Sequence, residues 1–224
     1  MTTRTSAIIL FARSAHLDAR EKGLSGGERF IAELTAQTKL KARRTGLQVF
    51  HIDEKSQVGN TFGERLGNAM KSVYDQGVEH LVVIGNDSPD LRTEELKRAA
   101  GLLEEGKTVF GPTPDGGTYL IGITREHFDC ETFMRLPWQE NLLLDALLIW
   151  SHRIGGRPEV LISLMDLDDA EDCQNWLTPS RFIYSRIYQL ILSFLSAKPI
   201  LRTAWIHPDF QIYCSVPFNK GSPF

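Results

Sequence analysis

The chain has 224 residues, of which 42% are hydrophobic, so it can bury one substantial core. Its 25 Lys and Arg residues are balanced by 28 Asp and Glu residues, and the formal net charge of -3 argues against nucleic acid as a main partner. Three cysteines, Cys130, Cys173 and Cys214, lie far apart without Cys-x-x-Cys spacing, which argues against a disulfide framework or zinc site and favours reduced thiols in the cytoplasm.

Strand-like and helix-like runs alternate from the N-terminus, and this alternation predicts an α/β fold with a mainly parallel sheet flanked by helices. A first strand is expected over Ala7–Phe11. The capping-box pattern of residues 25–28 predicts the start of the first helix, which should end near Gly46. A second strand is expected over Gln48–Ile52.

A second capping-box pattern, over residues 61–64, predicts a helix that should end at Gly77. The apolar run from Leu81 to Ile84 then predicts a buried strand. Ligands of open α/β sheets bind just beyond the carboxyl ends of the strands, where Asn86 and Asp87 follow. Asp87 is therefore a candidate catalytic or metal-binding carboxylate, although Asp-Ser-Pro is also ordinary turn chemistry.

A helix is expected from Thr93 to Gly106, and two apolar strands then flank the turn Asp115-Gly116-Gly117. Glycines let a backbone approach a phosphate-bearing ligand closely, so Asp115, Gly116 and Gly117 are candidates for the site. The same residues are also typical of a turn without chemistry.

A buried helix is expected over Gln139–Trp150 and a last strand or strand pair over Val160–Leu167. Asp166 and Asp168 lie two residues apart, so in an extended segment they point to the same side. Together with Asp87 they could hold Mg²⁺, which takes one or two carboxylates and completes its shell with waters and phosphates. The alternative is that Asp168 or its neighbour only caps the next helix.

Several other residues are candidates for ligand contact. Arg13, Arg20 and Lys22 follow the first strand, where cations would favour a diphosphate, or they are solvated surface charge. Gln57 and Arg65 flank the second capping box and could contact a base or sugar, or be surface decoration. Trp138 could stack on an acceptor or anchor a loop.

Residues 178–224 differ in character from the preceding domain, which we place over residues 1–177. Apolar residues from Ile183 to Leu195 form the stripe of an amphipathic helix that is too short and too polar to span a membrane. This helix could pack on the core or on a second copy of the chain as a homodimer, and membrane contact is the less favoured alternative.

Five segments resemble an uncharacterised bacterial family of glycosyltransferase-A-like proteins, related to the nucleotide-diphospho-sugar transferases and to 2-phospho-lactate guanylyltransferase. The segments are residues 9–13, 57–65, 84–90, 111–117 and 166–172. The resemblance covers residues 6–177 and implies a Rossmann-like glycosyltransferase-A fold. It also implies a divalent cation, Mg²⁺ or Mn²⁺, between Asp87 and the Asp166/Asp168 segment, with Asp115 and its glycines lining the donor or acceptor pocket.

One departure from the family pattern lies after the first strand. Family members carry a Gly-x-x-Lys-Thr-Arg-Leu signature there, whereas residues 14–24 of this chain keep basic residues in a different register. The expected function is a metal-dependent glycosyl or nucleotidyl transferase that uses a nucleotide-sugar or nucleoside triphosphate and a small-molecule acceptor. The alternative is a catalytically inactive protein that keeps the fold for binding or assembly.

Overall fold

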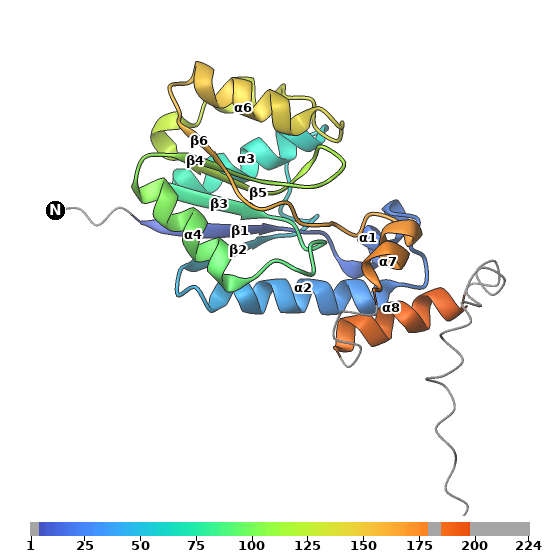
Figure 1. Cartoon of the computed structure of the whole chain (residues 1–224). Helices are drawn as coiled ribbons and strands as arrows, with labels where there is room; N and C mark the ends of the chain where they lie inside the picture. The colour runs from blue at the N-terminus through green and yellow to red at the C-terminus, as the bar shows by residue number, and fades with distance from the viewer. Residues whose placement is uncertain (1–4, 179–184, 198–224) are drawn as a thin grey trace, which may run out of the picture.

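The computed structural model describes residues 5–178 and 185–197 as an α/β fold around one six-stranded sheet (Figure 1). The sheet has the order β2-β1-β3-β5-β4-β6. Its strands are β1 (Ser6–Phe11), β2 (Gln48–Ile52), β3 (His80–Ile84), β4 (Thr108–Pro112), β5 (Thr118–Thr124) and β6 (Pro158–Val160). Strand β5 runs antiparallel to its neighbours β3 and β4, and the other paired strands are parallel. The predicted fold class is therefore confirmed.

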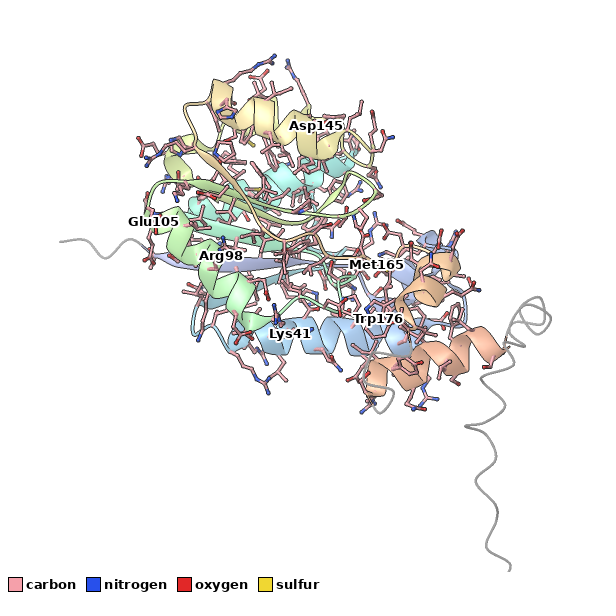
Figure 2. All side chains as sticks on the ribbon, in the orientation of Figure 1. Lys41, Arg98, Glu105, Asp145, Met165 and Trp176 are labelled. Atoms are coloured by element: carbon pink, nitrogen blue, oxygen red, sulfur yellow. The ribbon has the colours of Figure 1, made fainter. Side chains whose placement is uncertain are left out.

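Helices cover both faces of this sheet, as Figure 1 shows. One face packs against α3 (Phe62–Tyr74), α5 (Cys130–Met134) and α6 (Leu143–Arg153). A short 3-10 helix at Arg125–His127 precedes α5. The other face packs against α2 (Glu28–Arg43) and α4 (Thr93–Glu104). Lys41 of α2 lies where these two helices approach each other (Figure 2), and its Nζ donates to the Pro89 carbonyl at 2.9 Å.

The carboxyl ends of β1, β3 and β4 meet at one edge of the sheet, because these strands run in the same direction. Helices α1 (Ala15–Glu21) and α7 (Ala170–Trp176) lie at this edge (Figure 1). Buried apolar strands of five or six residues, with every residue of β3 buried, explain why the edge is held rigidly. The loops that leave it are the positions from which an α/β sheet binds ligands.

The helix boundaries follow the predicted signals in one place and depart from them in another. The Thr61 hydroxyl accepts from Glu64 N at 3.1 Å and the Glu64 carboxylate accepts from Thr61 N, so that capping box is confirmed. The box expected at Ser25 is wrong. Helix α2 begins after Gly27 without a side-chain cap, and Glu28 Oε1 instead accepts from Gly26 N at 3.1 Å. Helix α1, which was expected as a loop, precedes it.

The segment after β6 also differs from the prediction. The strand expected over Val160–Leu167 is wrong, because β6 ends at Val160 and the chain leaves the sheet in an extended form. Backbone hydrogen bonds from Leu161 and Leu164 reach β4, and one of 3.0 Å from Leu167 N reaches the Asp87 carbonyl. Because this segment crosses from β4 toward the end of β3, it does not form a regular ladder of hydrogen bonds with either strand. Likewise, the predicted helix over Gln139–Trp150 begins only at Leu143.

Helix α8 (Arg186–Ala197) packs against α2 and α7 of the same chain. The rings of Phe30 and Phe194 lie 5.2 Å apart, and Arg186 Nε lies 2.9 Å from Glu33 Oε2. Ile183, at the start of the predicted stripe, lies outside the described residues. No helix in the described ranges is long and apolar enough to cross a membrane.

The packing of α8 predicts a loss of stability when its inward face is truncated. Ile191 is 0% exposed, so Ile191→Ala should lower the free energy of unfolding by about 2–4 kcal/mol through lost burial and a residual cavity. Urea denaturation measures this. Ile149→Ala is the matched control, because Ile149 also lies in a helix but is 54% exposed, and it should change stability by less than about 0.5 kcal/mol. Equal losses in the two variants would contradict the packing of α8.

Candidate functional site

A cavity of about 520 Å³ opens at the carboxyl edge of the sheet. It is lined by the ends of β1 and β3, by the β4–β5 turn, by α1 and α3, and by the segments 138–141 and 166–168. Met165, which precedes the last segment, lies at this end of the sheet in Figure 2. The volume falls within the range of about 300–1,000 Å³ that is typical of small-molecule sites.

Lys22 is the central cation of this cavity. Its Nζ lies 2.8 Å from Asp87 Oδ2 and 2.7 Å from Asp168 Oδ1, and it donates to the Leu167 carbonyl at 3.2 Å. Burial alone would lower the pKa of Lys22, but the charges of Asp87 and Asp168 outweigh burial and raise that pKa above its usual value. Conversely, burial opposes ionisation of Asp87, but Lys22 holds the pKa of that carboxyl below its usual value. Lys22 therefore stays charged and ties three segments together.

Three carboxylates form a group that could hold a cation. One oxygen from each of Asp115, Asp166 and Asp168 lies within 4.8 Å of the others. Burial, followed by the charges of Asp87, Asp168 and Asp115, raises the pKa of Asp166 to about 7. Asp87, which the sequence predicted as a third ligand beside Asp166 and Asp168, pairs with Lys22, as Asp168 also does, and the third member of this group is Asp115.

The β4–β5 turn positions Asp115. Its Oδ1 accepts from Gly117 N at 3.1 Å and from the Thr113 hydroxyl. Gly116 adopts a φ of 92°, and a Cβ there would lie 1.9 Å from the Asn141 carbonyl oxygen. The Gly116 carbonyl also accepts from Leu144 N at 3.0 Å. Gly117 lines the cavity, whereas Gly116 serves to join the turn to the segment before α6.

Asn86 is buried, and its side chain holds Asp18, a residue that the sequence analysis did not identify. Its Nδ2 donates to Asp18 Oδ2 at 3.1 Å and to the Thr35 hydroxyl at 2.9 Å. Burial raises the pKa of Asp18, and Lys22 partly offsets that rise. Asp18 and Lys22 are four residues apart, a spacing that puts them on one helix face. Recognising α1 as a helix would have revealed the pair.

The structure brings some of the other predicted contact residues to the cavity and leaves others outside it. Arg13 lines the cavity and pairs with Glu21, and Gln57 lines it while donating from Nε2 to the Ile52 carbonyl at 3.4 Å. Arg20 is exposed on α1, and Arg65 donates to the Asn60 carbonyl at 3.2 Å. Neither Arg20 nor Arg65 belongs to the lining.

Aromatic side chains form a second kind of surface in the same cavity. The rings of Phe11 and Phe62 lie 5.7 Å apart, and those of Phe62 and Trp138 lie 5.6 Å apart. Trp138 Nε1 donates to the Phe133 carbonyl at 3.0 Å, which fixes the indole. Trp138 thus anchors its loop and also lines the cavity. The sequence analysis did not name Phe11 or Phe62 as a candidate for ligand contact.

Residues 27–140 match the family described as "Uncharacterized protein conserved in bacteria (DUF2064)". The fold is similar to that of a "putative nucleotide-diphospho-sugar transferase" from Desulfovibrio desulfuricans G20, with a TM-score of 0.74 and 22% identity over 84% of this chain and 94% of that one. A search of curated proteins finds no match.

Two more distant structures share less of the fold. A 4-diphosphocytidyl-2C-methyl-D-erythritol synthase from Anaerococcus prevotii DSM 20548 has a TM-score of 0.46 and 10% identity, over 75% of this chain and 94% of that one. Rv0371C from Mycobacterium tuberculosis H37Rv, in complex with manganese, has a TM-score of 0.42 and 16% identity, over 77% and 97%.

The crowding of carboxylates around Asp166 predicts a pH-dependent cost to stability. An unfolded Asp titrates near 3.8 whereas Asp166 titrates near 7, so its contribution to stability is full below about pH 4 and is lost as the pH rises through 7. Without divalent cations, Asp166→Asn should therefore raise the free energy of unfolding at about pH 8, by roughly 1–2 kcal/mol after solvent screening, and do little at about pH 4. Urea denaturation across this range measures the difference. Asp145→Asn, an exposed change on α6, is the control, and a gain for Asp166→Asn that does not vary with pH would contradict the assignment.

The close contact between Gly116 and Asn141 predicts a loss of stability when Gly116 is replaced. Gly116→Ala should destabilise the protein by about 1–3 kcal/mol, because Ala strains at a φ of 92° and its Cβ meets the Asn141 backbone. Gly101→Ala is the control, since that glycine lies in α4 with nothing within 4 Å of its Cβ position, and it should gain up to about 1 kcal/mol. Thermal unfolding distinguishes the two, and a neutral Gly116→Ala would show that this contact is not required.

Proposed function

The chain belongs to the bacterial family described as "Uncharacterized protein conserved in bacteria (DUF2064)", and we propose that it is a cation-dependent transferase that uses a nucleotide-sugar or a nucleoside triphosphate as donor. The observation that carries this proposal is the group formed by Asp115, Asp166 and Asp168, beside the ammonium of Lys22, in one cavity at the carboxyl edge of the sheet. The fold shared with a "putative nucleotide-diphospho-sugar transferase" supports it.

The residues present fit a divalent cation. Mg²⁺ and Mn²⁺ prefer carboxylate oxygens, and Asp115, Asp166 and Asp168 offer three of them within 4.8 Å of one another. Burial, followed by the neighbouring carboxylates, raises the pKa of Asp166, and a bound cation would relieve the repulsion among these carboxylates. When bound there, the cation would neutralise charge that develops on donor phosphates as the bond to the leaving group breaks.

The protein's own residues would orient the donor. Lys22 remains protonated beside the cluster, so its ammonium can attract a phosphate oxygen without any proton transfer. We propose that Asp87 acts mainly by fixing Lys22, and that Asn86 acts by fixing Asp18 behind it. Arg13, which pairs with Glu21, supplies a second positive charge in the cavity lining. Gly117, whose backbone borders the cavity, would lie close to the ligand.

A noncatalytic role in assembly has less support. That alternative drew on the apolar stripe of the C-terminal helix, and in the structure Ile187, Ile191 and Leu195 of α8 are buried within the chain's own cluster with α2 and α7. It also drew on the altered loop after β1. That loop contains α1, which brings Asp18 and Lys22 into the cavity.

The proposal predicts separable effects on cation and nucleotide binding. In calorimetric titrations, Asp166→Asn should weaken Mn²⁺ or Mg²⁺ binding about tenfold or more, because a carboxylate of the acidic group is lost. Lys22→Met should leave cation binding intact or strengthen it, while weakening binding of nucleoside triphosphates or nucleotide-sugars in the presence of Mg²⁺ by about tenfold or more.

Asp145→Asn serves as the control, because it removes an exposed carboxylate of α6 (Figure 2) that does not line the cavity, and it should match the wild type. A wild-type protein that binds neither a divalent cation nor any member of a panel of nucleotides and nucleotide-sugars would refute the transferase.

A further inference from the structure

We propose that the aromatic part of the cavity, bounded by Phe11, Phe62 and Trp138, receives an acceptor that presents an apolar ring and carries no negative charge. This inference rests on the proposed transferase, since it concerns the group to which that enzyme would transfer. It follows from two independent features of the cavity, the continuity of its aromatic surface and the pairing of its cations.

The aromatic surface is continuous and fixed in place. Phe62 contacts Phe11 at 5.7 Å and Trp138 at 5.6 Å between ring centroids, and all three rings are only partly buried against the core. The Trp138 indole is held by its hydrogen bond to the Phe133 carbonyl and by contact with the Phe133 ring at 4.8 Å. A rigid, partly open aromatic surface favours a flat apolar partner, because little side-chain entropy is lost on binding.

Two of the polar side chains that line the cavity near these rings in the sequence are uncharged amides, and Arg13 and Glu140 there are charged. Gln139 follows Trp138, and Gln57 lies five residues before Phe62, and both line the cavity. Amides donate to and accept from hydroxyl or amide groups but do not neutralise an anion. They therefore suit a neutral polar substituent on an apolar ring.

The charge of the cavity disfavours an anionic acceptor. The described residues that line it include seven carboxylates and two cations, Arg13 and Lys22, a formal balance of -5. Both cations are already paired, Arg13 with Glu21 and Lys22 with Asp87 and Asp168. A donor and its cation would further engage Lys22, so no lining cation in the described part of the chain is left for a second anion.

An anionic acceptor would therefore be desolvated beside like charges, which costs several kcal/mol in general. An acceptor such as 2-phospho-lactate, with a phosphate and a carboxylate, would need two positive partners, and the two cations in the described lining are already paired with carboxylates. An uncharged alcohol or amide that carries an apolar ring does not need a positive partner. The proposed class of acceptor thus follows from the pairing of Arg13 and Lys22 with carboxylates of the protein.

Benzamide and benzoate test this inference, because they have nearly the same shape and differ in charge. Binding of each to the full chain is measured by saturation-transfer NMR, with and without Mg²⁺ and without any nucleotide. We expect benzamide to bind and benzoate to bind at least about tenfold more weakly at the aromatic surface in both conditions. Trp138→Leu should weaken benzamide binding about threefold or more, because the stacking surface is lost.

Two further variants complete the test. Phe62→Leu should also weaken benzamide binding, and it keeps the test decisive if Trp138→Leu does not fold. Leu142→Ala is the control, since Leu142 lies in the same loop as Trp138 but is 58% exposed and does not line the cavity, and it should bind as the wild type does.

The inference is overturned if benzamide does not bind, if its binding is unaffected in both ring variants, or if benzoate binds as tightly in a manner that depends on Trp138. A benzoate signal that survives in Trp138→Leu, beside benzamide binding that does not, places the anion elsewhere and supports the inference. Failure of the proposed transferase is distinguishable, because it appears in the titrations with cation and nucleotide and not in these nucleotide-free measurements.

Discussion

The ammonium of Lys22 is the interaction on which the cavity depends. It contacts Asp87 after β3 and Asp168 in the segment that follows β6, and it donates to the Leu167 carbonyl, so a single cation joins α1 to two loops that are distant in the sequence. A buried ion pair of this kind adds little net stability, because desolvation offsets the attraction. Removing the cation alone, however, would leave carboxylates facing one another. Lys22 therefore fixes the geometry of the site more than it stabilises the fold.

Even with Lys22 in place, the site holds more negative charge than its surroundings neutralise, and this excess has a cost. Asp166 expresses it most clearly, because burial and three neighbouring carboxylates raise its pKa to about 7. Functional sites commonly retain such unfavourable arrangements when a ligand relieves them. The rigid elements around the cluster maintain the arrangement. The buried strand β3 fixes Asp87, and the β4–β5 turn, joined at Gly116 to the segment before α6, fixes Asp115.

The contact between Gly116 and Asn141 also connects the acidic and aromatic parts of the cavity. Gly116 approaches Asn141 so closely that no side chain fits between them, and Trp138 lies three residues before Asn141. The position of the acidic turn and the position of the indole are therefore set together. Carboxylates and a flat apolar surface in one cavity give it two chemically distinct parts, which the proposed transfer between a phosphate-bearing donor and a different acceptor would use.

The sequence by itself determined the sheet, the order of its main elements and the residues that emerge at its carboxyl edge, because buried strands and glycine-ended helices have strong local signals. Asp87, Asp115, Asp166, Asp168 and Lys22 could all be named as candidates from the sequence. How these side chains pair with one another could not. Helix α1 is short, so its pairing of Asp18 with Lys22 was not visible, and the extended segment after β6 is held by contacts to β4 and Asp87 that leave no periodic pattern. Which carboxylates lie together is visible only in the tertiary structure, where Lys22 contacts both Asp87 and Asp168, and the contact of Gly116 with Asn141 helps to place Asp115 near Asp166 and Asp168.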